Sequence, residues 1–540
     1  MASAFALTLL LPLAARAQDE KPEQKPAPQS KSEPAPADPP DSVTQGTVDV
    51  GGQHIAYTAV AGIITVGATD AQDAQLGLDG KPLPGSQLAL SAPKDPADAP
   101  PLAHMFYVAY FKAGANPEER PVTFFYNGGP GSSTMWLHLG SLGPKYVETG
   151  DTHLPGAPYK LVDNPYCLLD TSDLVFIDMP GTGFGRLTGK DPGKAFWGLD
   201  EDAGAFARFI ARFLTKNSRW NSPKFLFGES YGTTRSAVLA NLLENRKNID
   251  LNGVMLLGEI FNFPIGIGVG GGRPGMDLPF ELALPTYAAT AWFHNKLSPK
   301  PPDLAAFLKE VEDFALGGYM HALAEGNAIP DAEKQSVAEK IHEYTGLPVA
   351  YVLKANLRVN GGEFEKTFAD DEDMTTGRYD TRFLGPTIDP LSESAEYDPQ
   401  SAAISSAYNS LINLYLRDDL KFGAGETYLP DALFDGVRWD WARSGRGGFG
   451  AGGVNVSSDL ADAMKTNPDL KVMVNDGYYD LATPFFAAQY EEEHLPIPPP
   501  LTKNIEYNWY ESGHMAYVRD ECRKQLHDRV AAFIRSSDTR

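Results

Sequence analysis

Cysteine, basic residues and long apolar runs are scarce in this sequence. The 540 residues include only Cys167 and Cys522, so one disulfide could form but no disulfide framework; the alternative is two buried thiols. Lys and Arg total 46 against 70 Asp and Glu, a formal net charge of −24, which disfavours binding to nucleic acid and anionic membranes. No uncharged apolar run is long enough for a transmembrane helix, so we expect no stable membrane insertion.

Motifs for metals and nucleotides are also missing. The chain has no zinc-type spacing of Cys and His and no phosphate loop of the GxxxxGK[ST] type. We therefore expect no metal and no organic cofactor.

The N-terminal region differs in composition from the rest of the chain. The stretch 4-AFALTLLLPLAARAQ-18 is apolar and ends in a small-x-small pattern, which predicts a signal peptide over 1–17. It lacks the usual N-terminal Lys or Arg, and a disordered apolar tail is the alternative. Residues 18–42 are rich in Pro, Lys and Glu, which predicts a disordered Pro-rich linker because such a segment buries too little surface to offset its ordering entropy.

Apolar runs beyond residue 50 alternate with helical patterns. The runs 53–67 and 104–112 predict antiparallel edge strands. Shorter continuous runs predict strands buried on both faces, and helical patterns at 203–214 and 235–245 lie between them, so we expect an α/β fold with a central, mostly parallel sheet. The predicted buried strands are 122–126, 174–178, 224–227, 253–257, 470–474 and 503–509.

This alternation stops between about residues 265 and 450. The segment contains helix-like stretches at 302–326 and 402–420 and no convincing buried strand. We therefore predict a large, mostly helical cap insertion at 265–450, which divides the sheet domain into a first part at 43–264 and a second part at 451–540.

Between predicted strand 224–227 and the following helix lies Gly228-Glu229-Ser230-Tyr231-Gly232. Small flanking residues allow a sharp turn that projects the Ser230 hydroxyl over the carboxyl edge of the sheet. The alternative is a tight turn without chemistry. A second glycine cluster, 127-NGGPG-131, follows another buried strand and could point backbone N–H groups at an oxyanion. The other donor would be the N–H of Tyr231.

Candidate acids and bases follow the last two predicted strands. Asp476 and Asp480 lie in 475-NDGYYDLATP-484, and His514 lies in 510-YESGHMAY-517. The order serine, acid, histidine is the one used in this type of sheet, and both carboxylates remain candidates on position alone. His527 lies on a helical pattern, where a surface histidine is the simpler interpretation.

Several stretches together resemble the motifs of serine carboxypeptidases. The resemblance implies an α/β-hydrolase fold, peptide substrates and release of C-terminal residues from them. It assigns the nucleophile to Ser230, the acid to Asp480 and the base to His514. It also implies oxyanion donors at Gly129 and Tyr231 and a site for the substrate's terminal carboxylate at Asn127 and Glu229. The stretches are 127-NGGPGSS-133, 164-NPYC-167, 176-FIDMPGTGFG-185, 228-GESYG-232, 477-GYYD-480 and 513-GHM-515.

The sequence also departs from the family pattern. Phe125 stands where the family usually has Trp, Ser132 where it has Cys, and Ser141 where a further glutamate of the carboxylate site would fall. The site thus keeps Asn127 and Glu229 and loses a third member, which favours an acyltransferase or esterase as the alternative function. A catalytically silent binding protein is a third hypothesis, and the presence of all three triad residues disfavours it.

Two cysteines and a short apolar leader fit a bacterial exported protein, so we expect a periplasmic or secreted location. The sequence does not determine the oligomeric state or the side-chain preference of the enzyme. Arg378 and Arg382 could reach the site, but surface salt bridges are the simpler interpretation for both.

Overall fold

The computed structural model describes residues 38–150, 155–266, 274–434, 436–443 and 453–538. The predicted signal peptide, 1–17, and most of the predicted linker, 18–42, lie outside the described residues. The end of that linker is ordered, because the Asp38 carboxylate lies 2.6 Å from His104 Nδ1 and the first strand begins at Ser42.

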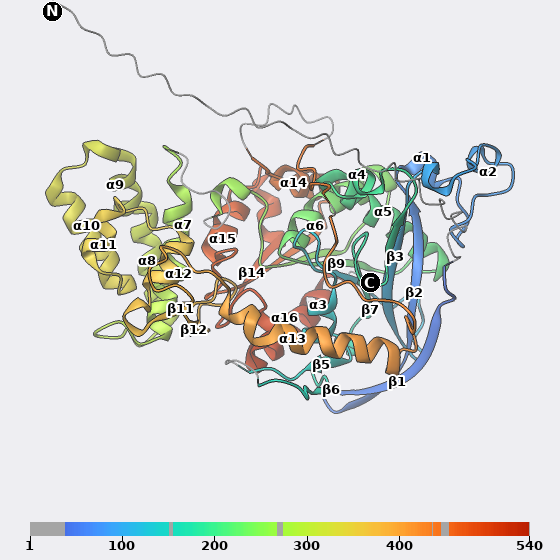
Figure 1. Cartoon of the computed structure of the whole chain (residues 1–540), viewed down its shortest axis with the longest axis horizontal. Coiled ribbons are helices and arrows are strands. Elements are labelled where there is room, and N and C mark those ends of the chain that lie inside the picture. Colours follow the sequence, from blue (N-terminus) through green and yellow to red (C-terminus); the bar gives the residue numbers. More distant parts are fainter. Residues whose placement is uncertain (1–37, 151–154, 267–273, 435, 444–452, 539–540) are drawn as a thin grey trace, which may run out of the picture. The chain divides into compact units, whose positions relative to one another are not determined.

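A ten-stranded sheet forms the centre of the described chain (Figure 1). Its order is β1-β2-β3-β7-β4-β9-β10-β13-β14, and β8 pairs with β3. Six neighbouring strands of the sheet, β7, β4, β9, β10, β13 and β14, run parallel to one another. The pairs that involve β1, β2, β3 and β8 are antiparallel. The bounds are β1 Ser42–Val50, β2 Gln53–Gly67, β3 Leu102–Lys112, β4 Val122–Tyr126, β7 Asp173–Ile177, β8 Arg186–Thr188, β9 Lys224–Glu229, β10 Gly253–Leu257, β13 Lys471–Gly477 and β14 Ile505–Tyr510.

The predicted antiparallel edge is confirmed, and a strand lies at each of the six positions predicted for buried strands. Five of these strands are buried, but β14 lies at the other edge of the sheet and is only partly buried. β1 was not predicted because three of its four exposed positions are polar, which weakens the apolar signal. The position of β4 between β7 and β9, with the sharp turn that follows β9, defines an α/β-hydrolase fold.

Alternating side chains of the parallel strands build two apolar layers. On β4, Phe124 joins the layer under α5 and α6, whereas Phe125 joins the layer under α13 and α16. Both side chains are fully buried, so the strand shows no polar alternation. The helices are α3 Met135–Gly140, α5 Leu199–Lys216, α6 Tyr231–Leu242, α13 Pro399–Leu414, α14 Ser457–Thr466 and α16 Asp520–Ser537.

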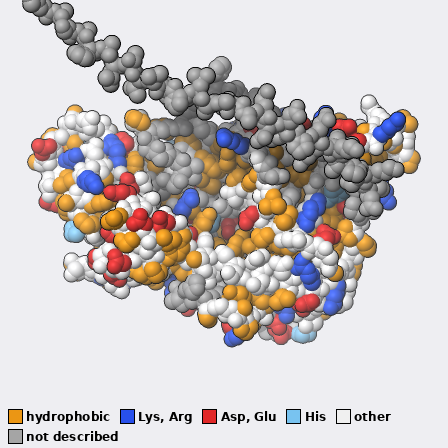
Figure 2. Space-filling view, viewed as in Figure 1, with side chains coloured by type: hydrophobic (Ala, Val, Ile, Leu, Met, Phe, Trp, Pro, Cys, Tyr) orange, Lys and Arg blue, Asp and Glu red, His pale blue; other side chains and the backbone are white. Residues whose placement is uncertain are grey.

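The helices α7 to α12 form a third apolar cluster, together with α15, and lie beside the β14 edge of the sheet in Figure 1. Within this region the strands β11 and β12 form a short hairpin. Figure 2 shows acidic side chains gathered over α12 and this hairpin. The bounds are α7 Leu278–Phe293, α8 Leu304–Phe314, α9 Met320–Glu325, α10 Asp331–Thr345, α11 Val349–Lys354, α12 Gly361–Thr367, β11 Met374–Thr376, β12 Leu384–Pro386 and α15 Phe485–Glu493.

The remaining elements are short, and the predicted helices differ from the observed ones in detail. The predicted stretch 302–326 divides into α8 and α9, because a π-helical turn at Ala315–Tyr319 separates them. The boundaries 265–450 for a cap insertion stay a prediction. The short elements are α1 Asp70–Asp73, α2 Gln87–Leu90, β5 Lys145–Val147, β6 Leu161–Asp163 and α4 Pro192–Phe196.

The two cysteines are buried, unpaired thiols. Both belong to the apolar layer under α13 and α16, which agrees with the second of the two alternatives drawn from the sequence. Among the helices of the described chain, none combines the length and the hydropathy of a membrane span.

Candidate active site

Ser230 occupies the turn between β9 and α6 in a conformation that non-glycine residues rarely adopt. Its φ is 60° and its ψ is −130°, and its N–H donates to the Leu257 carbonyl at 2.8 Å. Such backbone strain at a strand-to-helix turn is typical of a serine presented to substrate. The turn also needs Gly128 opposite it, because a Cβ there would lie 2.4 Å from the Tyr231 nitrogen.

His514 and Asp480 form a direct pair at the same edge of the sheet. His514 follows β14, Asp480 follows β13, and His514 Nδ1 lies 2.6 Å from Asp480 Oδ2. The other ring nitrogen, Nε2, is buried and has no hydrogen-bond partner in the described chain. His514 and Ser230 line the same cavity, so Nε2 is the ring atom available to the serine.

The Asp480 carboxylate is held by three further donors. The N–H groups of Ala482 and Thr483 donate to Oδ1 at 2.8 and 3.0 Å, and the Thr483 hydroxyl donates to Oδ2 at 2.7 Å. Burial lowers the pKa of His514, but the charge and hydrogen bond of Asp480 outweigh it, so the net pKa is raised above its ordinary value. This pairing stabilises the imidazolium that forms when His514 takes a proton.

A short segment at 377–382, here called the clamp segment, lies between the loops that carry Asp480 and His514. The Tyr379 carbonyl accepts the His514 N–H at 2.7 Å, and the Tyr479 carbonyl accepts the Thr381 N–H at 2.9 Å. On the same segment, Asp380 accepts the Gly513 N–H at 3.1 Å. The clamp segment therefore fixes the acid loop and the base loop relative to each other.

The interpretation of Arg382 as a surface residue is wrong. Its side chain is 1% exposed and pairs with the fully buried Asp380 at 2.7 Å. It also donates to the Ser512 hydroxyl at 3.3 Å, beside the loop of His514. Two opposite charges two positions apart give no sequence signal of burial, because the burial of this pair depends on the loop of His514 that folds over it.

Glu229 lies in the apolar interior next to the serine. Burial raises its pKa to about 7, although His514, Tyr517 and Asn127 each lower it in part. The Tyr517 hydroxyl donates to Glu229 Oε2 at 2.8 Å, which leaves Oε1 as the oxygen that can carry the carboxyl proton. Asn127 is oriented by the Leu137 N–H, which donates to its Oδ1 at 3.0 Å.

Ser141 supplies no replacement for a third carboxyl group. Its hydroxyl donates to the Leu137 carbonyl at 2.6 Å, so it completes a helix end. Tyr517, which the sequence reasoning missed, is instead the group that touches Glu229. Its position three residues after His514 was the sequence feature that could have pointed to this contact.

A cavity of about 240 Å³ opens over these groups. Of the six residues that the sequence analysis singled out besides Ser230, four line the cavity, namely Asn127, Gly129, Glu229 and His514, and Asp480 lies behind His514. Tyr231 begins α6, where its N–H follows the serine. The full lining is Asn127, Gly128, Gly129, Ser132, Trp136, Glu229, Ser230, Tyr379, Gln400, Ser401, Ile404, Ser405, Asp431, His514 and Met515.

Asp476, the other carboxylate left open by position, belongs to a different group. It accepts the Glu259 N–H at 2.9 Å and lies in a buried cluster of carboxyl groups with Glu259, Glu491 and Glu492. Both carboxyl oxygens of Glu259 and of Glu492 are buried without a hydrogen-bond partner in the described chain. Burial raises the pKa of all four, and repulsion among their charges raises that of Glu259 further. We call this group the acid cluster.

His527 differs from the expected surface histidine. It is 8% exposed and its Nε2 lies 3.3 Å from the Asp170 carboxylate. Burial lowers its pKa, while Asp170 and Asp528 raise it to a net value above the ordinary one. It therefore joins α16 to the loop before β7 and does not line the cavity.

Arg235 is a further residue that sequence reasoning missed. It lies on α6 with no exposed side chain and pairs with the equally buried Asp202 at 2.6 Å. It also donates to the Asn127 carbonyl at 2.7 Å. The available signal in the sequence was its position as the one charged residue of α6, five positions after the serine.

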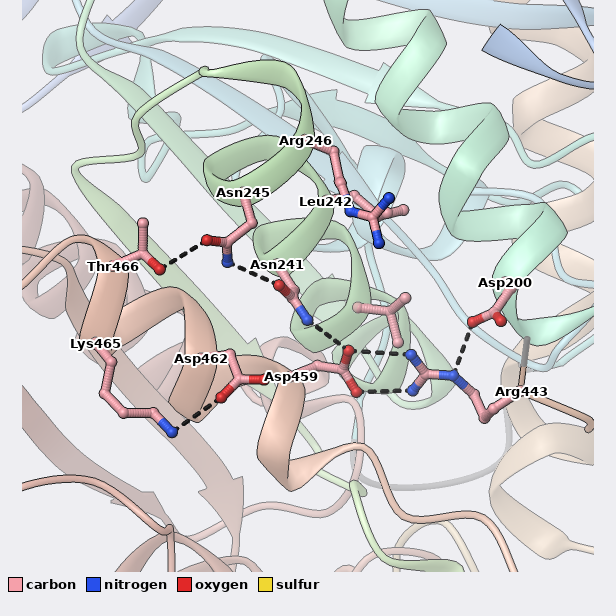
Figure 3. Close-up of a pocket in the computed structure, with 11 residues that line it drawn as sticks. Asp200, Asn241, Leu242, Asn245, Arg246, Arg443, Asp459, Asp462, Lys465 and Thr466 are labelled. Carbon is pink, nitrogen blue, oxygen red and sulfur yellow. Dashed lines mark hydrogen bonds and ion pairs between the residues drawn. The ribbon is translucent and has the colours of Figure 1, made fainter. Parts of the chain in front are cut away.

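A second cavity, of about 790 Å³, lies between α6, α14 and Arg443 (Figure 3). Two ion-pair groups lie in its wall: Arg443 contacts both Asp200 and Asp459 at 2.7 Å, and Lys465 contacts Asp462 at 2.9 Å. None of the residues of the candidate site lines it. Elsewhere, on α9 and α10, His321, Glu325 and Glu333 bring possible ligand atoms within 4.8 Å of one another, again away from the candidate site.

Comparisons with known proteins match part of the chain to one family. A family model described as "Serine carboxypeptidase" matches residues 97–262. That segment holds Asn127, Gly129, Glu229, Ser230 and Tyr231, and it ends before the acid and the base. The match covers less than a third of the chain, and over this segment the chain is similar to serine carboxypeptidases.

Individual relatives match over a similar part of the chain. "Carboxypeptidase Y homolog A" of Pyricularia oryzae is 27% identical over 157 residues, which cover 28% of this chain and 26% of that protein. "Serine carboxypeptidase-like 5" of Arabidopsis thaliana is 31% identical over 132 residues, 24% of this chain and 28% of that protein. The chain thus spans little more than a quarter of the length of either relative.

Among solved structures, a soluble variant of monoglyceride lipase from Saccharomyces cerevisiae is 11% identical and covers 81% of this chain and 93% of that one, with a TM-score of 0.33. A lipase in an open form gives a TM-score of 0.32 at 13% identity, over 81% of this chain and 96% of that one. At these scores the fold assignment rests on the strand order and the turn at Ser230.

Proposed function

We propose that this protein is a serine carboxypeptidase that releases C-terminal residues from peptides. The observation that carries the proposal is the convergence of Ser230, the His514–Asp480 pair and the buried Glu229 on one cavity. The family match over residues 97–262 supports the same function independently of the acid and the base.

The mechanism follows from the placement of each group. The Ser230 hydroxyl attacks the scissile carbonyl while His514 Nε2 accepts its proton, and Asp480 keeps the imidazole oriented through Nδ1. The N–H groups of Gly129 and Tyr231 stabilise the oxyanion. His514 then gives the proton to the departing amine, and water cleaves the acyl-enzyme in a second step of the same kind.

Glu229 supplies the selectivity for a free C-terminus. A carboxyl group that still carries its proton on Oε1 donates a hydrogen bond to the terminal carboxylate of the peptide, beside the amide of Asn127. Because its pKa is raised to about 7, this proton is present at acidic pH and is lost as the pH rises through 7. An ionised Glu229 repels the substrate carboxylate, so KM rises from acidic to neutral pH.

The test compares an N-blocked dipeptide with its C-terminal amide, at pH 4.5 and 7.5, for wild type and Glu229→Gln. We expect the free acid to be preferred at pH 4.5, with a lower KM than at pH 7.5. The amide should show no such change of KM, and Glu229→Gln should remove the change for the acid. A KM for the dipeptide that stays flat from pH 4 to 8 contradicts the role of Glu229.

An acyltransferase or esterase that uses the same triad is the second candidate. The observation that favours it is Ser141, whose hydroxyl is engaged by the Leu137 carbonyl and adds no carboxyl group to the site. Equal or better cleavage of amide and ester substrates, with no effect of Glu229→Gln, would support this candidate instead. A silent binding protein would fail to react with an organophosphonate probe at Ser230.

The composition of residues 1–17 also supports a periplasmic or secreted location. N-terminal sequencing of protein recovered from the exported fraction tests this, and a chain that begins near Gln18 is the expected result. Protein that retains residues 1–17 in the cell interior contradicts it.

A further inference from the structure

The cavity over Ser230 has a second carboxyl group besides Glu229, namely Asp431. It lies in the segment 428–434, which here is called the rim segment. In contrast to Glu229, Asp431 is exposed and therefore faces the open part of the cavity.

The rim segment is fixed against the glycine loop that contains Gly129. Asp431 pairs with Ser132 in an antiparallel bridge. The Ser133 N–H donates to the Pro430 carbonyl and the Ala432 N–H donates to the Gly131 carbonyl, both at 2.7 Å. Hydrogen bonds on both sides of Asp431 thus hold its backbone at a constant position relative to the oxyanion loop.

Side chains of the rim segment add two further anchors. The Tyr428 hydroxyl donates to the buried Asp178 at 3.1 Å, and the Phe434 ring lies edge-on to Trp197 with the ring centroids 5.0 Å apart. Ala432 is buried, whereas its neighbour Asp431 is exposed, as expected for adjacent residues of an extended segment. The carboxylate of Asp431 is therefore presented by a rigid support.

Asp431 makes no ion pair or side-chain hydrogen bond with any residue that the structure describes. Desolvation by the surrounding walls raises its pKa above the ordinary value, and no opposite charge lowers it. Neither Lys nor Arg occurs in the lining of the cavity. Among the described residues, no Lys or Arg thus pairs with Asp431 in the cavity, and a cationic ligand would relieve the cost of its partial burial.

The walls next to the nucleophile suit the stem of a long basic side chain. Trp136, Ile404 and Met515 line the same cavity as Asp431. Methylene groups of Lys and Arg pack on apolar surface while the charged end reaches a carboxylate, and an indole ring also attracts a cation.

We infer that Asp431 selects peptides that carry Lys or Arg on one of the two residues flanking the scissile bond. This inference rests on the proposed function, because it assigns a specificity to that same site. A free α-ammonium group of a short peptide is the competing cation, and blocked substrates separate the two.

The experiment uses N-blocked dipeptides in which Arg is replaced by citrulline, an uncharged analogue of nearly the same shape, at each of the two positions in turn. In wild type, Arg at the recognised position should be cleaved with a kcat/KM about 5- to 30-fold above that of citrulline, a range typical of a partly solvated charge pair. Asp431→Asn should bring the ratio close to one and leave cleavage of a blocked Leu dipeptide within about twofold, which also shows that the variant is folded.

The matched control is Glu426→Gln. Glu426 is an exposed acid that comes shortly before the rim segment and does not line the cavity. Glu426→Gln therefore changes the net charge by the same amount as Asp431→Asn. Glu426→Gln should keep the Arg preference of wild type. A ratio near one at both positions in wild type, or a preference that survives in Asp431→Asn, overturns the inference.

A failure of the proposed function gives a different result. In that case no blocked dipeptide is cleaved, although an organophosphonate still labels Ser230. The same Arg and citrulline pairs offered as methyl esters then test Asp431 alone. An Arg preference among the esters that Asp431→Asn abolishes supports the inference, and its absence overturns it.

Discussion

Substituting Glu492 by Gln should flatten the pH dependence of stability. Glu492 is 2% exposed, both its oxygens lack hydrogen-bond partners in the described chain, and burial with the nearby charge of Glu491 raises its pKa well above the ordinary value. In the unfolded chain a glutamate ionises near pH 4.3. The folded protein therefore holds a proton that the unfolded chain has lost, and stability falls as the pH rises through this window.

The size of the effect follows from proton linkage. Each proton by which the folded state exceeds the unfolded state lowers the free energy of unfolding by about 1.4 kcal/mol per pH unit. Between pH 5.5 and 6.5, unfolded Glu492 is almost fully ionised. Wild type should therefore lose about 1.4 kcal/mol more than Glu492→Gln over this unit, while the other members of the acid cluster contribute equally to both proteins.

The assay is urea unfolding at pH 5.5, 6.0 and 6.5, with the free energy extrapolated to water. Glu493→Gln is the matched control, because Glu493 is the next residue of α15 and is exposed. In Glu493→Gln, the free energy of unfolding should change with pH as steeply as in wild type. If Glu492→Gln also keeps the wild-type slope, Glu492 is ionised in the folded protein and the reasoning from burial is refuted.

Three further substitutions test other contacts of the site. Tyr517→Phe removes a donor that stabilises ionised Glu229, so the pKa of Glu229 should rise and the pH at which KM increases should move up by about one unit; an unmoved KM profile contradicts this. Asp380→Asn weakens the clamp segment and should lower kcat at least about tenfold with little change in KM, measured alongside urea unfolding to separate positioning of His514 from loss of fold. Arg235→Met leaves its partner carboxylate buried and unpaired, which should cost about 3–5 kcal/mol in urea unfolding; a loss under about 1 kcal/mol would mean that water reaches the pair.

The positions of the strands along the chain could be predicted in large part from the sequence, because apolar runs without polar alternation identify buried strands. Their order in the sheet came only from the structure. The triad candidates came from the position of Ser230 and His514 after such strands. Their roles stay predictions until the kinetics are measured, since the family match ends at residue 262.

The sequence was uninformative wherever a contact joins segments distant in the chain. Tyr517 meets Glu229 across 288 positions, and Asp380 meets Gly513 across 133. The spacing of apolar residues predicts which face of a helix or strand is buried. It does not predict which polar group of a distant element will contact that helix or strand. For the same reason Arg382 resembled a surface residue, although the loop of His514 folds over it.

The clamp segment limits which parts of this protein can be exchanged with those of a relative. Because residues 377–382 hold both the acid loop and the base loop, the helical region to which they belong is not a detachable module. Grafting the corresponding region of a relative onto this sheet would replace part of the support of His514 along with the walls of the cavity. Exchange of substrate specificity between such proteins should therefore succeed only when the graft keeps the clamp segment of this chain.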